Sequence, residues 1–81
     1  MLDYNQALTQ LIEKARQVYE DRKSIYKDAI WTSVPVKSMV NSIIIKSHRL
    51  SLLTNKNNSL LVEELADIVN YAVFIYARTQ G

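Results

Sequence analysis

Apolar residues recur at steps of three and four along most of this 81-residue sequence, which is the spacing of amphipathic helices. Glycine and proline occur once each, so the chain lacks the turn residues on which an all-β fold depends. A chain of this length also has room for only one hydrophobic core. We therefore expect a single all-α domain over residues 1–81.

The spacing predicts three helices, at about residues 3–23, 35–53 and 59–78. Asp3 is the expected N-cap of the first helix, with Gln6 as the return partner of a capping box. Pro35 suits the first turn of the second helix. The polar residues 54–58 predict the turn before the third helix.

The apolar stripes of these helices define the expected buried faces. In the first helix the stripe comprises Tyr4, Leu8, Leu11, Ile12, Ala15, Val18 and Tyr19. In the second it comprises Val36, Met39, Val40, Ile43, Ile44, Ser47 and Leu50. After Asn70 the third helix is apolar on every side, and two other helices cannot easily cover it. We therefore expect a three-helix subunit that packs as a helical bundle and is completed as a homodimer or a larger assembly.

Composition excludes several classes of site. The chain has no cysteine, which excludes disulfides and thiolate metal sites, and its single histidine excludes a multi-histidine zinc site. A net charge of +2 is too small to indicate a nucleic-acid-binding surface.

The longest apolar run, residues 71–77, is far shorter than the roughly 20 residues of a membrane span. The first residues lack the pattern of a signal peptide, and we expect a cytoplasmic setting without a membrane partner.

Glu63, Glu64 and Asp67 are the strongest chemical signal in the sequence. Asp67 follows the two glutamates at helical spacings of four and three, so its carboxylate shares a face with both. Exposed to solvent, such a cluster needs no partner, because two charges at about 5.5 Å repel by less than about 1 kcal/mol in water. In a cleft the cluster requires a cation, and Mg²⁺ is one candidate because it favours carboxylate oxygens.

Lys46 and Arg49 on the second helix are the other candidate counter-ions. An antiparallel pairing of the second and third helices brings Arg49 towards Glu63 and Glu64. Two interpretations remain open at this point. The groups form structural salt bridges, which are individually worth little, or the cations form a phosphate clamp beside a metal-binding acidic group.

Four further residues are candidates for ligand contacts. Tyr26 and Trp31 lie in the least periodic segment and offer rings that can stack on a nucleobase or pack onto the bundle. Asn70 is a polar residue entering an apolar helix and needs a hydrogen-bond partner if it is buried. Tyr71 lies one turn after Asp67 and can reach the same cleft.

Three blocks of the sequence resemble a known family. Lys23, Tyr26 and Trp31 resemble its K..DYG..W segment, residues 45–50 its I-K-x-x-R-L segment, and residues 64–71 its E-x-x-D-x-x-N-Y segment. The family is the nucleotide modification associated domain, type one, of phages and bacteria. The E-E-L-x-D-I opening also resembles the second metal-binding helix of the MazG-like, all-α nucleoside triphosphate pyrophosphohydrolases. The resemblance covers roughly residues 19–78.

The resemblance implies a nucleotide or another phosphate-bearing ligand. The ligand-binding residues it implies are Lys46, Arg49, Asn70, Tyr71, Tyr26 and Trp31, and the implied Mg²⁺ ligands are Glu63, Glu64 and Asp67. No catalytic residue is identified. The chain departs from the MazG pattern because the second helix has no E-x-x-E pair, and it lacks the glycine of the first block.

We therefore expect a nucleotide-binding protein with weak or absent hydrolysis. Its expected role is in nucleotide or DNA-base modification, or in nucleotide sequestration. One alternative is an active Mg²⁺-dependent nucleoside triphosphate pyrophosphohydrolase. A second alternative is a non-catalytic helical assembly module, in which the acidic and basic groups pair structurally.

Overall fold

The computed structural model describes the backbone of residues 1–26, 30–53 and 58–80, and the side chains of these residues except 24–26, 30 and 31. The helices are α1 (Tyr4–Tyr26), α2 (Ile30–Ser33), α3 (Val36–Leu53) and α4 (Asn58–Gln80). The described ranges contain no strand, so the all-α prediction is confirmed. The three long helices match the predicted ones to within three residues at each end, and α2 is an additional single turn.

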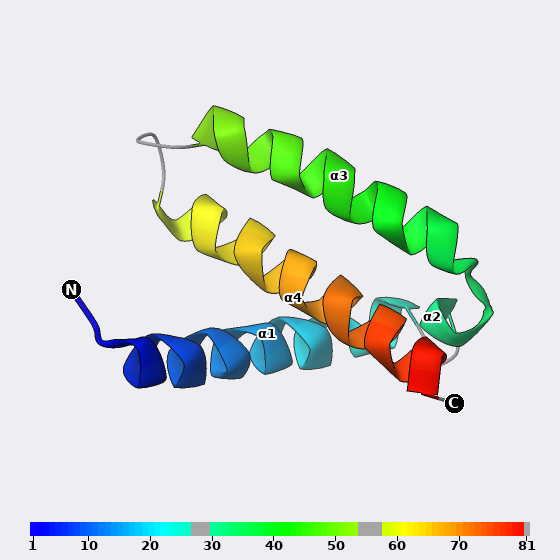
Figure 1. Ribbon diagram of the computed structural model, residues 1–81, viewed down its shortest axis with the longest axis horizontal. Coiled ribbons are helices and arrows are strands. Elements are labelled where there is room, and N and C mark those ends of the chain that lie inside the picture. The colour runs from blue at the N-terminus through cyan, green and yellow to red at the C-terminus, as the bar shows by residue number, and fades with distance from the viewer. Residues whose placement is uncertain (27–29, 54–57, 81) are drawn as a thin grey trace.

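Helix α4 lies between α1 and α3 and packs against both of them (Figure 1). Helices α3 and α4 run antiparallel, as the short connection between them requires. Among the described residues, α1 and α3 have no extensive contact with each other. The subunit is therefore a three-helix arrangement centred on α4. No helix in the described ranges has the length and hydropathy needed to cross a membrane.

The start of α1 is fixed by the predicted capping box. The backbone N–H of Gln6 donates to Oδ1 of Asp3 at 2.9 Å, and the backbone N–H of Asp3 donates to Oε1 of Gln6 at 3.2 Å. Two N–H groups that would have no partner within the helix are thereby satisfied. At the start of α3, the carbonyl oxygen of Pro35 accepts hydrogen bonds from the backbone N–H groups of Ser38 and Met39, which satisfies both of these donors.

The apolar core is small. Ala15 and Val18 of α1 and Ala66 of α4 form one buried cluster, against which Val69 packs. Met39 of α3 is the remaining fully buried apolar residue in the described part of the chain. Two alanines at the contact allow α1 and α4 to approach closely. The buried cluster therefore lies between α1 and the middle of α4.

The predicted stripe of α1 is buried only in its second half. Ala15 and Val18 are buried, but Tyr4, Leu8 and Ile12 are exposed. The first turns of α1 diverge from α4 in Figure 1, and their apolar side chains are accordingly exposed. The prediction that the whole stripe is buried is wrong for this reason.

The predicted stripe of α3 is also wrong in part. Val40, Ile44 and Ser47 are exposed. The side of α3 that is turned towards the interior instead follows the spacing of Val36, Met39, Ile43, Lys46, Leu50 and Leu53. The helix is rotated relative to the prediction because Lys46 has carboxylate partners on α4, which allow a charged side chain to occupy a position within the apolar row.

Candidate functional site

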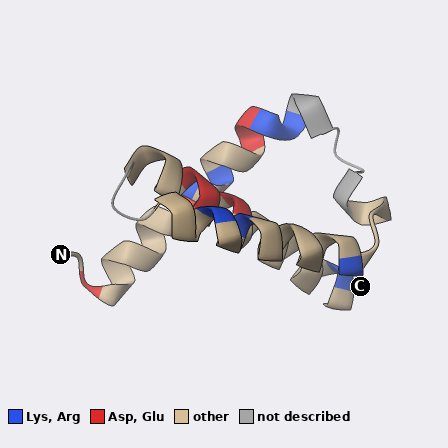
Figure 2. Cartoon of the chain, turned by 90° about the horizontal axis from the view of Figure 1, so that it is seen from above, with Lys and Arg blue, Asp and Glu red and all other residues tan. Residues whose placement is uncertain are grey.

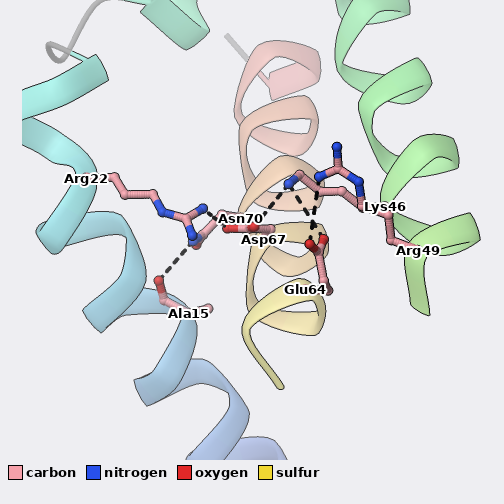
Figure 3. Close-up of polar contacts among 7 residues, drawn as sticks. All are labelled: Ala15, Arg22, Lys46, Arg49, Glu64, Asp67 and Asn70. Carbon is pink, nitrogen blue, oxygen red and sulfur yellow. Dashed lines mark hydrogen bonds and ion pairs between the residues drawn. The ribbon is translucent and has the colours of Figure 1, made fainter. Parts of the chain in front are cut away.

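Five charged side chains from three helices meet beside the centre of α4 (Figure 3). They are Arg22 from α1, Lys46 and Arg49 from α3, and Glu64 and Asp67 from α4. We call this group the charge cluster. Its α3 and α4 members are those that the sequence predicted to approach one another.

Asp67 is the centre of the charge cluster and is only 6% exposed. Its Oδ1 atom accepts a hydrogen bond from Nη1 of Arg22. Its Oδ2 atom accepts one from Nζ of Lys46 at 3.0 Å. Both carboxylate oxygens therefore face cations, one from each helix that packs against α4. A buried carboxylate requires such partners, because burial without them is strongly unfavourable.

Glu64 lies at the α3 side of the charge cluster, and its ionic contacts are longer than the Lys46 contact of Asp67. Its Oε2 atom is 3.7 Å from Nζ of Lys46, and its Oε1 atom is 3.8 Å from Nη1 of Arg49. Both distances are too long for a hydrogen bond. Oε2 is buried and has no hydrogen-bond partner among the described residues. The side chain of Arg49 is 58% exposed, so its guanidinium group is the part of the charge cluster most open to solvent.

The cations of the charge cluster outnumber its carboxylates, three to two. The short hydrogen-bonded contacts gather around Asp67, whereas the longer contacts are those of Glu64. The uncompensated positive charge therefore lies towards the α3 side, at Arg49. An anion of suitable size would be attracted to this side.

Asn70 and Tyr71 make contacts within the subunit. The side-chain amide of Asn70 donates to the main-chain carbonyl oxygen of Ala15 at 2.9 Å, which joins α4 to α1 (Figure 3). The ring of Tyr71 meets that of Phe74 edge to face, with centroids 5.9 Å apart, and Tyr19 contacts Phe74 in the same manner. Asn70 thus has the hydrogen-bond partner that a polar residue at this position requires.

The Mg²⁺ ligands implied by the resemblance are Glu63, Glu64 and Asp67. Among the described residues, no three or more acidic or histidine side chains converge so that they could hold a metal ion. Glu63 forms no ion pair with the described residues and is not part of the charge cluster. Both oxygens of Asp67 already face Arg22 and Lys46, and these cations would repel a divalent ion placed there.

Two predicted ligand contacts lie outside the described side chains. These are Tyr26, which ends α1, and Trp31, which lies in α2. The backbone places both residues in or beside the connection between α1 and α3. Their predicted contacts with a ligand remain predictions.

Arg22 is the member of the charge cluster that the sequence prediction missed. It is 45 residues from Asp67 in the chain, and no local spacing relates the two. A signal was nevertheless present, because Arg22 follows Val18 by four residues and Ala15 by seven. A cation that continues an apolar helical stripe needs an anion from the neighbouring helix.

No protein-family model, curated protein or solved structure matches the chain. The sequence segments 45–50 and 64–71 supply Lys46, Arg49, Glu64 and Asp67, which are four of the five members of the charge cluster.

Proposed function

We propose that this protein binds a phosphate-bearing small molecule of the nucleotide class at the α3 side of the charge cluster, without hydrolysing it. The observation that carries the proposal is the excess of cations in the charge cluster, together with the exposure of Arg49 at 58%. Among the described residues Arg49 has one long ionic contact, so its guanidinium group retains most of its five donors for an incoming anion.

The two cations of α3 have different roles in this proposal. Arg49 contacts the phosphate, for which its planar guanidinium group is suited because it can donate two parallel hydrogen bonds. Lys46 is held between Glu64 and Asp67, with its side chain only 17% exposed. It therefore keeps a fixed position and adds positive potential to the ligand site.

The contacts of Asp67 support the proposal that hydrolysis is weak or absent. The family resemblance makes this residue a metal ligand, but here its two oxygens accept hydrogen bonds from Arg22 and Lys46. Helix α3 also lacks the carboxylate pair of the pyrophosphohydrolases. The resemblance to the nucleotide modification associated domain supports a role in nucleotide or DNA-base modification, or in nucleotide sequestration, in a phage or a bacterium.

A calorimetric titration tests the proposal. The probes are nucleoside mono-, di- and triphosphates and cyclic dinucleotides, each with and without Mg²⁺, with inorganic phosphate as the simplest anion. We expect at least one nucleotide to bind, and Arg49→Ala to weaken that binding about tenfold or more, the loss of one charge-assisted contact. The matched control is Arg16→Ala, which removes the same charge from an exposed position of α1 outside the charge cluster.

Three results would contradict the proposal. They are no response to any nucleotide from the folded protein, equal weakening by Arg49→Ala and Arg16→Ala, or release of pyrophosphate during incubation with a triphosphate. The last result would instead support the pyrophosphohydrolase alternative.

A second candidate function is a non-catalytic helical assembly module. The observation that favours it is the pairing of Asp67 with cations from two other helices, since such pairing has a structural effect without any ligand. Incubation with a mixed nucleotide pool, followed by mass spectrometry, distinguishes the candidates. A retained nucleotide supports the first proposal, and neither product nor retained ligand supports the second.

A further inference from the structure

One side of α1 continues beyond the part that α4 covers. Positions 4, 8, 11, 15, 18 and 22 follow one another at alternating steps of four and three residues, as positions do along the contact line of two packed helices. The last three of them contact α4. Ala15 and Val18 belong to the buried cluster, and Arg22 pairs with Asp67. The same line of contact therefore extends towards the N-terminus, where positions 4, 8 and 11 lie.

The first half of this side of α1 is uncovered. Tyr4, Leu8 and Ile12 are 77%, 42% and 43% exposed, and Leu11 is half-buried. We call these four residues the N-terminal face of α1. Figure 1 shows why they are exposed, since the first turns of α1 diverge from α4. The N-terminal face thus has the spacing of a helix-packing surface, but the described part of the subunit supplies no helix that covers it.

The segment that carries the N-terminal face has no charged side chain. Residues 4–12 are apolar or uncharged polar residues, whereas residues 13–23 include seven charged ones (Figure 2). A helix that binds a lipid surface typically has several lysine and arginine residues on its polar side, and residues 4–12 have none. The composition of this segment therefore favours contact with another protein helix.

The two charges that border this segment favour a second copy of the chain as the partner. Asp3 precedes the N-terminal face and Lys14 follows it, and their separation of about three helical turns places them on the same edge of α1. Lys14 forms no ion pair with the described residues. In an antiparallel pair of α1 helices, Asp3 lies near Lys14 of the partner subunit, and the reverse contact follows by symmetry. A parallel pair would instead bring like charges together.

We propose that the N-terminal face of α1 packs antiparallel against the same face of a second copy of this chain, in a two-fold symmetric dimer. The face is self-complementary, because Leu8 meets Leu8 of the partner subunit at the axis and Tyr4 lies beside Ile12 of the partner subunit. A contact through a few turns of one helix is small, so we expect dimers at high micromolar concentration and isolated subunits in dilute solution. This interface is independent of the proposed ligand site, which lies at the α3 side of the charge cluster.

Sedimentation velocity over a concentration series from micromolar to millimolar tests the dimer. Leu8→Glu places two like charges at the proposed axis, and Ile45→Glu adds the same charge to α3 at a residue that is 56% exposed. Glutamate is a good helix former, so neither substitution disfavours its helix, and circular dichroism checks the helical content. We expect the unmodified protein and Ile45→Glu to dimerise at the upper end of the series, and Leu8→Glu to remain a helical monomer throughout.

A cross-link provides a second measurement that does not depend on Leu8→Glu. The chain has no cysteine, so an introduced thiol reports on one position only. The Tyr4→Cys and Ile12→Cys proteins are mixed at high micromolar concentration and treated with a short thiol-specific cross-linker. We expect the two variants to be joined to each other, and neither to be joined efficiently to itself.

Three results would overturn the proposal. The first is an unmodified protein that is monomeric at every concentration. The second is a dimer that Ile45→Glu dissociates and Leu8→Glu does not, which would place the interface on α3. The third is cross-linking of Tyr4→Cys with itself but not with Ile12→Cys, which would indicate a parallel pair.

Discussion

The ammonium nitrogen of Lys46 lies 3.0 Å from Oδ2 of Asp67, and this hydrogen bond joins α3 to the middle of α4. The other oxygen of the same carboxylate accepts a hydrogen bond from Arg22 on α1. Helices α1 and α3 have little direct contact with each other among the described residues, so Asp67 is a point at which both are held. In a subunit with so small an apolar core, this carboxylate links all three long helices.

Replacement of Asp67 by asparagine should destabilise the fold. The substitution leaves Arg22 and Lys46 without their carboxylate, and the loss of one partner from a largely buried ion pair costs about 3 kcal/mol. We expect a decrease of this size in the free energy of unfolding, measured by urea denaturation.

The control for this substitution is Glu63→Gln. Glu63 is an acidic residue of the same helix but forms no ion pair with the described residues, and its change should alter stability by less than about 0.5 kcal/mol. Equal losses from Asp67→Asn and Glu63→Gln would show that Asp67 does not hold the helices together.

Asn70 provides a separate link between α4 and α1. Its side-chain amide donates to the main-chain carbonyl oxygen of Ala15, and this contact should contribute about 1 kcal/mol to stability. Asn70→Ala also raises helix propensity, so its effect must be compared with that of Asn41→Ala on an exposed position of α3. We expect Asn70→Ala to be less stable than Asn41→Ala by about 1 kcal/mol. Similar stabilities for the two variants would indicate that the hydrogen bond to Ala15 has no net effect.

The helices could be predicted from the sequence because their signals are local. The capping pair Asp3 and Gln6, the single proline and the three-and-four spacing each act within one or two turns of the chain. The approach of Lys46 and Arg49 to Glu64 was also predictable, since a short connection makes α3 and α4 neighbours. Local pattern therefore determines the elements and this one pairing.

The orientation of α3 about its own axis and the ion pair between Arg22 and Asp67 could not be predicted from local pattern. Both depend on Asp67, because its burial places Lys46 in the interior and leaves Val40 and Ile44 exposed. Apolar spacing alone treats a lysine as a surface residue and gives no information on a partner 45 residues away. The ion pairs across three helices, rather than propensity, decide these features.

The contact between α1 and α4 should be intolerant of larger side chains. Ala66 is fully buried and lies in one cluster with Ala15 and Val18. Ala66→Leu inserts additional methylene groups into this contact and should decrease stability by about 2 kcal/mol, within the range for overpacked cores. The control is Ala77→Leu at an exposed position of the same helix, which should change the urea midpoint little. A folded and equally stable Ala66→Leu protein would mean that α1 and α4 are further apart than the structure shows.

The capping box should stabilise the first turns of α1 without affecting the whole subunit. Asp3→Ala removes the oxygen that accepts the N–H of Gln6, and such a loss costs about 1 kcal/mol of helix stability. Tyr4 and Leu8 are exposed, so the first turns of α1 have few contacts that couple them to the core. We therefore expect faster amide hydrogen exchange at residues 4–8 and little change in the global unfolding midpoint. Asp3→Asn retains a side-chain oxygen at the cap and should exchange at nearly the original rate. If Asp3→Ala instead lowers the global midpoint as strongly as Asp67→Asn does, the first turns of α1 are packed against something that the isolated subunit does not contain, such as a second copy of the chain.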